Sequence, residues 1–369
     1  MAESGTRRRR GLLSPGTVIR DTYTVNQWLG AGQFADVYRV RHRYMGMQAM
    51  KVFDTGLEVD PNEDRFYEAF LLAGVSHPNI VRVFDANVIN SELDQREFLT
   101  MELVSGGTLE SFVEGRAEPL SPELVLDLLR AIALGLACGH AQDPPIVHRD
   151  VKPSNILVSQ SSSTPTVKVA DFGLARWINP VTGLATSAGT ILYTPPEGFK
   201  GYMVPASDVY SLGLVGYQLL CECLPFRTND LTVDSAGSIC RDRVRSAQEQ
   251  TWSPPSYFNN KVPKQIDEII MTALSADLSV RYTTAGEFVQ ALENVRSGVT
   301  VVPASSNLSV QKAQEVHELV VRAFESAKSR NTLSDAVACL EEALEIHSEL
   351  SGQFACYLEA WRAESEVER

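Results

Sequence analysis

The sequence lacks any run of about 18 apolar residues, the length that a helix needs to cross a bilayer. We therefore expect no integral membrane segment. The four arginines from Arg7 to Arg10 are not followed by an apolar stretch, so the sequence does not predict a secretory signal. Cysteine is scarce as well, because only six are present and none forms a C-x-x-C pair. This usage predicts reduced thiols and a cytoplasmic location.

Positive charge is low relative to negative charge. The chain has 33 Lys and Arg residues against 46 Asp and Glu residues, which gives a net charge of −13. Such a chain repels phosphate backbones, so we expect no nucleic acid as a partner. The hydrophobic fraction of 44% is too high for a disordered chain. A length of 369 residues suggests about two domains.

Composition and hydrophobic periodicity predict how the chain is divided. Residues 1–20 are typical of a flexible basic leader, and residues 21–296 of one main domain. Residues 297–309 have the proline and serine content of a linker. Residues 310–369 are acidic and strongly helical.

Within the main domain, a β-rich part precedes a helical part. Ser121 followed by Pro122 is typical of a helix start, with the helix continuing to His140. Alternating or short apolar stretches predict strands, and apolar residues at helical spacing predict helices. The predicted strands are 23–25, 36–40, 81–84 and 98–103, and the predicted helices are 61–75, 124–140 and several within 207–295.

A glycine-rich turn lies between the first two predicted strands. Gly30 and Gly32 would let backbone N–H groups approach a phosphate closely, although Ala35 stands where a third glycine is usual. Lys51 follows a predicted strand and could supply a cation, which Glu68 on the next helix could fix in place. Taken alone, each of these residues is more typical of an ordinary turn or a solvated surface charge.

The segment from His148 to Asn155 carries the most specific pattern. Asp150 and Asn155 lie five residues apart, and Asp171 begins the segment Asp-Phe-Gly after another apolar stretch. Two carboxylates and an amide provide the oxygen ligands that Mg²⁺ prefers beside phosphate. Their joint occurrence in this order and spacing indicates a site for a metal–phosphate complex.

With these motifs the chain resembles a eukaryotic-type (Hanks-type) protein kinase, and its short catalytic domain resembles the bacterial members. The resemblance covers about three quarters of the chain. It implies an α+β, two-lobed kinase fold, with a β-rich N-lobe and a helical C-lobe, followed by a C-terminal α-helical extension. It also implies ATP as a ligand, with Mg²⁺, or Mn²⁺ in its place, as the metal.

The resemblance assigns the parts of phosphoryl transfer to individual residues. Asp150, Lys152, Lys51 and Glu68 are the implied catalytic residues, while Asn155 and Asp171 would bind the metal. Met101 would be the gatekeeper, and Glu102 and Val104 would offer backbone groups to adenine. The residues implied in nucleotide binding are Gly30, Ala31, Gly32, Val37, Ala49, Lys51, Met101, Glu102, Val104 and Leu157.

The resemblance also implies the type of substrate. Lys152, two residues after Asp150, is typical of serine/threonine kinases, so the expected partners are protein substrates with Ser or Thr hydroxyls. Residues 189–197 resemble the substrate-facing segment, in which Glu197 would pair with Arg281. Asp208 would hold the backbone of the catalytic loop.

Regulation by phosphorylation is implied by Arg149, because an arginine beside the catalytic aspartate can bind a phosphate on the activation loop. Thr186 stands at the usual phosphosite of the family, and Arg176 would join Arg149 around it. We therefore expect autophosphorylation in a signalling role, and an activity loss of about tenfold or more in Thr186→Ala.

Residues 310–369 leave two interpretations open. Ala336, Leu340 and Ala343 fit a tetratricopeptide-like hairpin, although Phe324 stands where a small residue is usual. The segment is either a helical extension docked on the large lobe or a module that binds a partner protein. The alternatives to an active kinase are a weakly active kinase-fold scaffold that binds partners through this segment, and a small-molecule phosphotransferase.

Overall fold

The computed structural model describes most of the chain from Leu12 to Arg362. The residues outside the description are 1–11, 33–34, 55–74, 91–94, 144, 160–164, 173–191, 201, 227–251, 299–315, 317–318, 321, 325, 328–331, 347, 349–353, 355–356 and 363–369. The chain forms two compact units. The N-lobe contains residues 1–76 and 81–105, and the C-lobe contains residues 77–80 and 106–369. None of the helices in the described part has the length and hydropathy required to span a bilayer.

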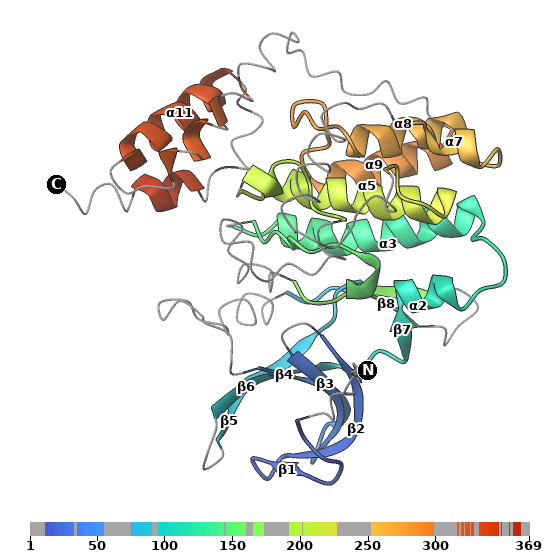
Figure 1. The fold of residues 1–369 in the computed structure, drawn as a ribbon, viewed down its shortest axis with the longest axis vertical. Helices are drawn as coiled ribbons and strands as arrows, with labels where there is room; N and C mark the ends of the chain where they lie inside the picture. Colours follow the sequence, from blue (N-terminus) through green and yellow to red (C-terminus); the bar gives the residue numbers. More distant parts are fainter. Residues whose placement is uncertain are drawn as a thin grey trace, which may run out of the picture. The chain divides into compact units, whose positions relative to one another are not determined.

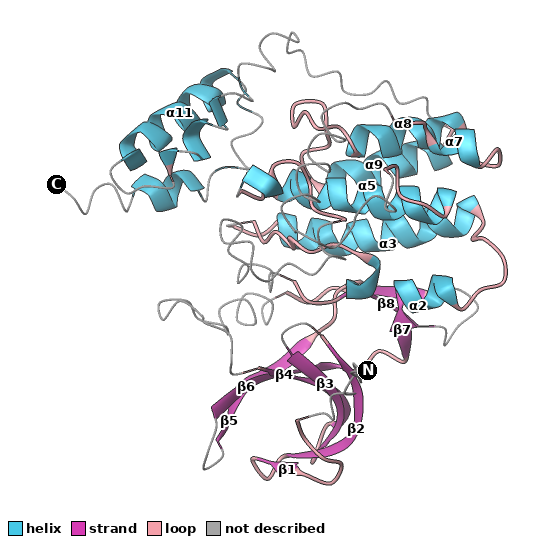
Figure 2. Ribbon diagram, viewed as in Figure 1, coloured by secondary structure: helices cyan, strands magenta, loops and turns pink. Residues whose placement is uncertain are grey.

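The described N-lobe is a strongly curled antiparallel sheet in the order β1-β2-β3-β4-β6-β5 (Figure 2). Its strands are β1 (Val18–Ile19), β2 (Tyr23–Ala31), β3 (Ala35–His42), β4 (Gly46–Phe53), β5 (Val83–Asn90) and β6 (Gln95–Glu102). The predicted strands at 23–25, 36–40 and 98–103 are confirmed, whereas the one predicted at 81–84 begins at Val83 and continues to Asn90. Polar residues extend β5 because pairing with β6 satisfies their backbone groups.

Alternation along the strands gives this sheet two different faces. The buried face forms a hydrophobic cluster in which Tyr38, Met50 and Phe98 have no exposed surface. Its members are Ile19, Tyr23, Val25, Tyr38, Val40, Met50, Val52 and Phe98. The residues between them, including Lys51, therefore lie on the opposite face.

Residues 12–19, which the sequence assigned to a flexible leader, are bonded to this sheet. The Leu12 N–H donates to Asp36 Oδ2 at 3.0 Å, and the Leu13 N–H donates to the Tyr38 hydroxyl at 2.9 Å. Ile19, in β1, is buried in the cluster of the sheet. Apolar side chains in this segment explain the packing, because their burial offsets the entropy lost on ordering.

The C-lobe contains a small sheet, β7-β8-β9, and helices that lie between and after its strands in the sequence (Figure 1). The strands are β7 (Gly106–Thr108), β8 (Ile156–Ser159) and β9 (Thr166–Val169). The helices are α2 (Leu109–Glu114), α3 (Pro122–His140), η1 (Pro153–Asn155), η3 (Gly198–Lys200), α5 (Pro205–Cys221), α7 (Pro255–Phe258), α8 (Lys264–Ala273), α9 (Ala285–Arg296) and α11 (Leu333–Ile346).

The predicted start of α3 is confirmed. The Ser121 side chain accepts a hydrogen bond from the Leu124 N–H at 3.3 Å, and Pro122 occupies the first turn. Gly135 allows close packing, because an added Cβ would lie 2.7 Å from the Asn79 carbonyl oxygen. Helix α5 is buried along almost its whole length, so the C-lobe is built around it.

Candidate active site

In the N-lobe, two rows of paired residues lie on the sheet face opposite the hydrophobic cluster. Lys51 of β4 pairs with Val37 of β3 and with Leu99 of β6. Ala49 pairs with Met101, two residues further along the same face. Lys51 lies inside β4, not after the strand as the sequence suggested, because β4 continues to Phe53. The register thus gathers four of the expected nucleotide-binding residues.

Gly30 and Ala31 form the end of β2, and Gly32 follows them at the turn to β3. The Gly32 N–H donates to the Ala35 carbonyl oxygen at 2.7 Å, which closes the turn. Among the described residues, no atom would lie within 4 Å of a Cβ added at Gly30. Packing inside the protein therefore does not require a glycine at this position, whereas a phosphate approaching the backbone would.

The strand end that would hold adenine is also fixed by a backbone hydrogen bond. The Glu102 N–H donates to the Arg82 carbonyl oxygen at 2.8 Å. Met101, Glu102 and Val104 are half-buried. In the C-lobe, Leu157 is likewise half-buried, and it lies on β8 between Thr108 and Lys168 of the neighbouring strands.

The catalytic loop of the C-lobe is held by the buried carboxylate of Asp208. This carboxylate accepts the backbone N–H groups of His148 at 2.7 Å and of Arg149 at 2.8 Å. It also bonds the His140 ring at 2.9 Å. The bracing role that the resemblance implied for Asp208 is confirmed. Arg149 has φ 69°, a left-handed conformation that these bonds stabilise.

Three of the expected site residues meet in this loop. The Lys152 ammonium and the Asn155 amide both lie 2.8 Å from Oδ2 of Asp150. The Asn155 amide donates a second hydrogen bond to the Asp150 carbonyl oxygen at 2.9 Å. Neither of these side-chain contacts uses Oδ1 of Asp150. The carboxylate is therefore oriented through one oxygen, and the other can accept the proton of a hydroxyl group.

The expected metal ligands come from two neighbouring segments of the C-lobe. The Ala170 N–H donates to the Asn155 carbonyl oxygen at 2.9 Å, which fixes the residue before Asp171 against Asn155. Because both side-chain hydrogen bonds of Asn155 come from Nδ2, its Oδ1 can serve as an oxygen ligand. Asp171 adds a carboxylate and adopts φ 60°. This oxygen donor set fits Mg²⁺ or another hard divalent cation.

Glu197 and Arg281 form a buried ion pair, as the resemblance implied. Arg281 Nη1 lies 2.6 Å from Oε1 of Glu197, and Nη2 lies 3.2 Å from Oε2. The two residues are only 3% and 2% exposed. The Ser207 hydroxyl also donates to Glu197, at 2.8 Å. The end of the predicted substrate-facing segment is thereby attached to the start of α5.

Several predicted residues lie outside the described residues, namely Glu68, Arg176, Thr186 and the segment 189–191. The described groups belong to two separate units, with Lys51 and the glycine turn in the N-lobe and Asp150, Lys152, Asn155, Leu157 and Asp171 in the C-lobe.

Two histidines support the site without having been singled out from the sequence. His148 Nδ1 accepts the Asp150 N–H at 3.2 Å, so its Nε2 carries the proton donated to the Ala170 carbonyl oxygen at 2.8 Å. His140 likewise accepts the Ala285 N–H through Nδ1 and donates to Asp208. The position of His140 at the end of an amphipathic helix gave no signal of this role.

The fold and the site define the class of protein. A model of the protein kinase domain matches residues 23–294, about three quarters of the chain. The chain belongs to the protein kinase family, whose members use ATP and a divalent cation.

Several relatives of the chain are bacterial serine/threonine kinases. The chain is 34% identical over 294 residues to serine/threonine-protein kinase PknB of Mycobacterium tuberculosis, covering 76% of this chain and 44% of the relative. It is 32% identical over 290 residues to a probable PknB of Lactococcus lactis, covering 75% and 42%. The chain thus spans less than half the length of these relatives. The resemblance to Hanks-type bacterial kinases is confirmed.

A solved structure shows the same fold. The crystal structure of the PknI kinase domain of Mycobacterium tuberculosis matches with a TM-score of 0.56 and 23% identity. It covers 76% of this chain and 99% of that domain. The two-lobed kinase fold expected from the sequence is confirmed.

Proposed function

We propose that this chain transfers the γ-phosphate of ATP to Ser and Thr hydroxyls of proteins. The observation that carries the proposal is the arrangement around Asp150. Lys152 and Asn155 hold one carboxylate oxygen, Oδ2, and leave Oδ1 to accept the proton of the attacking hydroxyl. Alignment and charge neutralisation are the main requirements of phosphoryl transfer, and this group supplies both.

The other roles follow from where the residues lie. Lys51, on the sheet face that carries Val37 and Ala49, would hold the α- and β-phosphates and pair with Glu68. Asn155 and Asp171 would bind Mg²⁺, with Mn²⁺ as a substitute. When bound, the metal would neutralise charge on the phosphate oxygens. Lys152 would neutralise charge on the transferred phosphate.

We further propose regulation by autophosphorylation of Thr186, with Arg149 and Arg176 binding the phosphate. The support is the sequence and the position of Arg149 beside Asp150. A phosphothreonine carries a charge of about −1.5 to −2 and would pair with these arginines. A cytoplasmic, signalling role is proposed from the cysteine usage and the family. Of the six cysteines, the four that are described, Cys138, Cys221, Cys223 and Cys339, are free thiols.

The test is phosphate incorporation from labelled ATP and Mg²⁺ into the chain itself and into myelin basic protein. The wild-type chain should incorporate label on Ser and Thr, and Asp150→Ala should not. ATP binding, measured by calorimetry, should persist in Asp150→Ala because that residue contacts the hydroxyl rather than the nucleotide. If the wild-type chain and Asp150→Ala both bind ATP but neither incorporates label, the proposal is refuted and the interpretation as a kinase-fold scaffold is favoured.

A further inference from the structure

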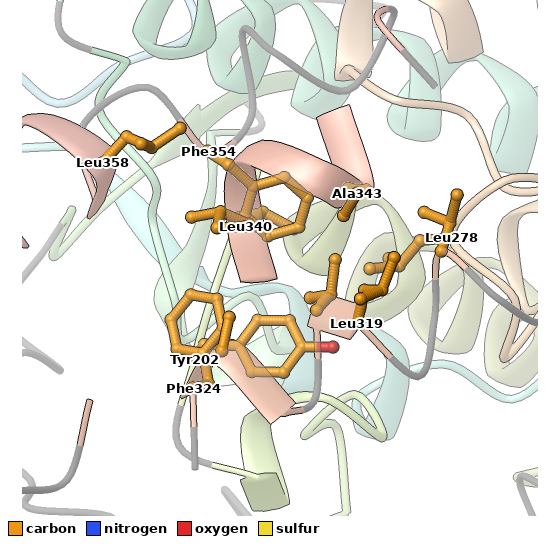
Figure 3. Close-up of a cluster of buried hydrophobic side chains, with 13 residues drawn as sticks. Tyr202, Leu278, Leu319, Phe324, Leu340, Ala343, Phe354 and Leu358 are labelled. Atoms are coloured by element: carbon orange, nitrogen blue, oxygen red, sulfur yellow. The ribbon is translucent and has the colours of Figure 1, made fainter. Parts of the chain in front are cut away.

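The described helical residues between Val316 and Arg362 pack against the loop that precedes α5. Tyr202 of that loop is 1% exposed and stacks on Phe324, with ring centroids 4.2 Å apart and an interplanar angle of 23°. Figure 3 shows Tyr202 and Phe324 side by side within one cluster. We call this the tail cluster, and its buried members are Tyr202, Val204, Ala206, Leu278, Val316, Leu319, Val320, Ala323, Phe324, Leu340, Ala343, Phe354 and Leu358.

The apolar stripe of α11 is therefore occupied within the chain. Leu340, Ala343 and Ala336 have no exposed surface. The stripe that the sequence left open as a partner-binding face is core of the C-lobe. Any partner of residues 310–369 would have to use other faces of the segment.

Tyr357 makes the polar connection between the segment and the loop. Its hydroxyl accepts the Met203 N–H at 3.1 Å and donates to the Met203 carbonyl oxygen at 2.6 Å. A tyrosine hydroxyl can do both at once. Met203 lies outside regular secondary structure, so its backbone groups need such partners. The neighbouring N–H groups of Tyr202 and Val204 bond Glu197 and Ser207 instead.

The clamped loop contacts the end of the predicted substrate-facing segment. A Cβ placed on Gly198 would lie 3.0 Å from the Met203 sulfur and 2.8 Å from Thr194 Cγ2, so these groups are tightly packed. Ser207, which accepts the Val204 N–H, donates to Glu197. A shift of Met203 would therefore displace its neighbours, including Thr194 and Glu197. The catalytic loop is held separately, by direct bonds to Asp208.

We propose that Tyr357 is a positioning residue for protein substrates, acting through Met203 on residues 194–198. The proposal rests on the proposed kinase function. The two hydrogen bonds between Tyr357 and Met203 hold a loop that contacts the substrate-facing segment and not the nucleotide residues. Their loss should therefore weaken protein binding and leave ATP binding unchanged. Residues 316–362 would then contribute to substrate binding by the kinase and would not be an independent module.

The test compares Tyr357→Phe with Tyr257→Phe in the full chain. Tyr357→Phe removes the hydroxyl but keeps the ring contacts to Phe324, at 4.7 Å, and Trp361, at 5.9 Å. Tyr257 is 74% exposed in the same lobe and serves as the matched control. Initial rates are measured with myelin basic protein and ATP as varied substrates. Tyr357→Phe should raise the KM for the protein about three- to tenfold, as expected for lost hydrogen bonds, with the KM for ATP unchanged.

Hydrogen exchange at residues 198–204 provides a second readout that does not need activity. The Met203 amide should exchange at least about threefold faster in Tyr357→Phe and at the wild-type rate in Tyr257→Phe. Unchanged exchange of the Met203 amide in Tyr357→Phe would show that the Tyr357 hydroxyl does not hold Met203. Faster exchange with an unchanged KM for the protein would refute the positioning role of Tyr357. A wild-type chain without phosphate transfer would instead refute the proposed function and, with it, the role in substrate binding.

Discussion

The Asn155 amide donates two hydrogen bonds to Asp150, one to the carbonyl oxygen at 2.9 Å and one to the carboxylate at 2.8 Å. One side chain thereby links the proposed metal site to the proposed acceptor of the substrate proton. The amide nitrogen is used by Asp150, so Oδ1 is the atom that can face a cation. The orientation of Asn155 is therefore set by the protein and does not depend on the metal.

Asn155→Asp separates these two roles. An aspartate can bind Mg²⁺ but cannot donate to Asp150, and its charge would repel that carboxylate. We expect kcat/KM to fall about 100-fold, equivalent to about 2.7 kcal/mol, with no rescue by added Mg²⁺. Steady-state kinetics over a Mg²⁺ titration measure this. Asn294→Asp, at a partly exposed position of α9, is the control for added charge. Retained activity in Asn155→Asp would show that the tie to Asp150 is dispensable.

The Glu197–Arg281 pair predicts a large stability effect. Arg281→Met leaves a carboxylate without its cation in a site that is 3% exposed. We expect a loss of about 3–5 kcal/mol in the free energy of unfolding, measured with urea. The double variant with Glu197→Gln should lose less, because the uncompensated charge is gone.

An exposed ion pair of the same lobe supplies the comparison. Arg362 and Glu341 are 2.6 Å apart, with side chains 55% and 44% exposed. Arg362→Met should change the free energy of unfolding by no more than about 1 kcal/mol, because water screens the pair. Similar losses in Arg281→Met and Arg362→Met would contradict the prediction.

Much of the site could be predicted because its functional residues lie in short contiguous motifs. Asp150, Lys152 and Asn155 are close in sequence, so the local turn that unites them is implied by the family pattern. The histidine supports were missed because several of their partners are distant in sequence, such as the Ala285 N–H and the Asp208 carboxylate for His140.

The tail contact was equally hidden. The helical pattern of residues 310–369 predicts an apolar stripe but not the surface on which it packs. Tyr202 and Phe324 are 122 residues apart in sequence, and neither belongs to a motif. Only the three-dimensional arrangement shows that the stripe and the loop before α5 bury each other.

Two neighbouring cysteines should differ strongly in reactivity. Burial, and to a smaller extent Cys223, raises the pKa of the Cys221 thiol to about 12, whereas Cys223 is exposed. Because the thiolate is the reacting form, native Cys221 should react with iodoacetamide on the order of 100-fold more slowly than Cys223 at pH 8. The rate at Cys221 should rise about tenfold per pH unit below its pKa. Cys223→Ser and Cys221→Ser chains, read by mass spectrometry, isolate each thiol, and equal rates would contradict the pKa shift.

Substitutions at two glycines, Gly30 and Gly106, should distinguish an effect on ATP affinity from an effect on stability. An added Cβ at Gly30 meets no atom of the described part of the chain within 4 Å, so Gly30→Ala should change the free energy of unfolding by less than about 0.5 kcal/mol. Gly106 has φ +145°, and its added Cβ would lie 2.0 Å from the Val158 carbonyl oxygen. Gly106→Ala should therefore lose at least about 2 kcal/mol in urea unfolding.

For nucleotide affinity, the larger effect should come from Gly30→Ala and not from Gly106→Ala. Calorimetry with Mg²⁺ and ATP should give a Kd about tenfold weaker for Gly30→Ala, because the methyl group keeps the phosphates from the backbone N–H groups. The folded fraction of Gly106→Ala should bind ATP as the wild-type chain does, since Gly106 lies in the C-lobe strand β7 and its constraint is the contact with β8. Unchanged ATP affinity in Gly30→Ala would mean that the turn does not contact phosphate, whereas a destabilisation equal to that of Gly106→Ala would mean that the glycine serves the fold.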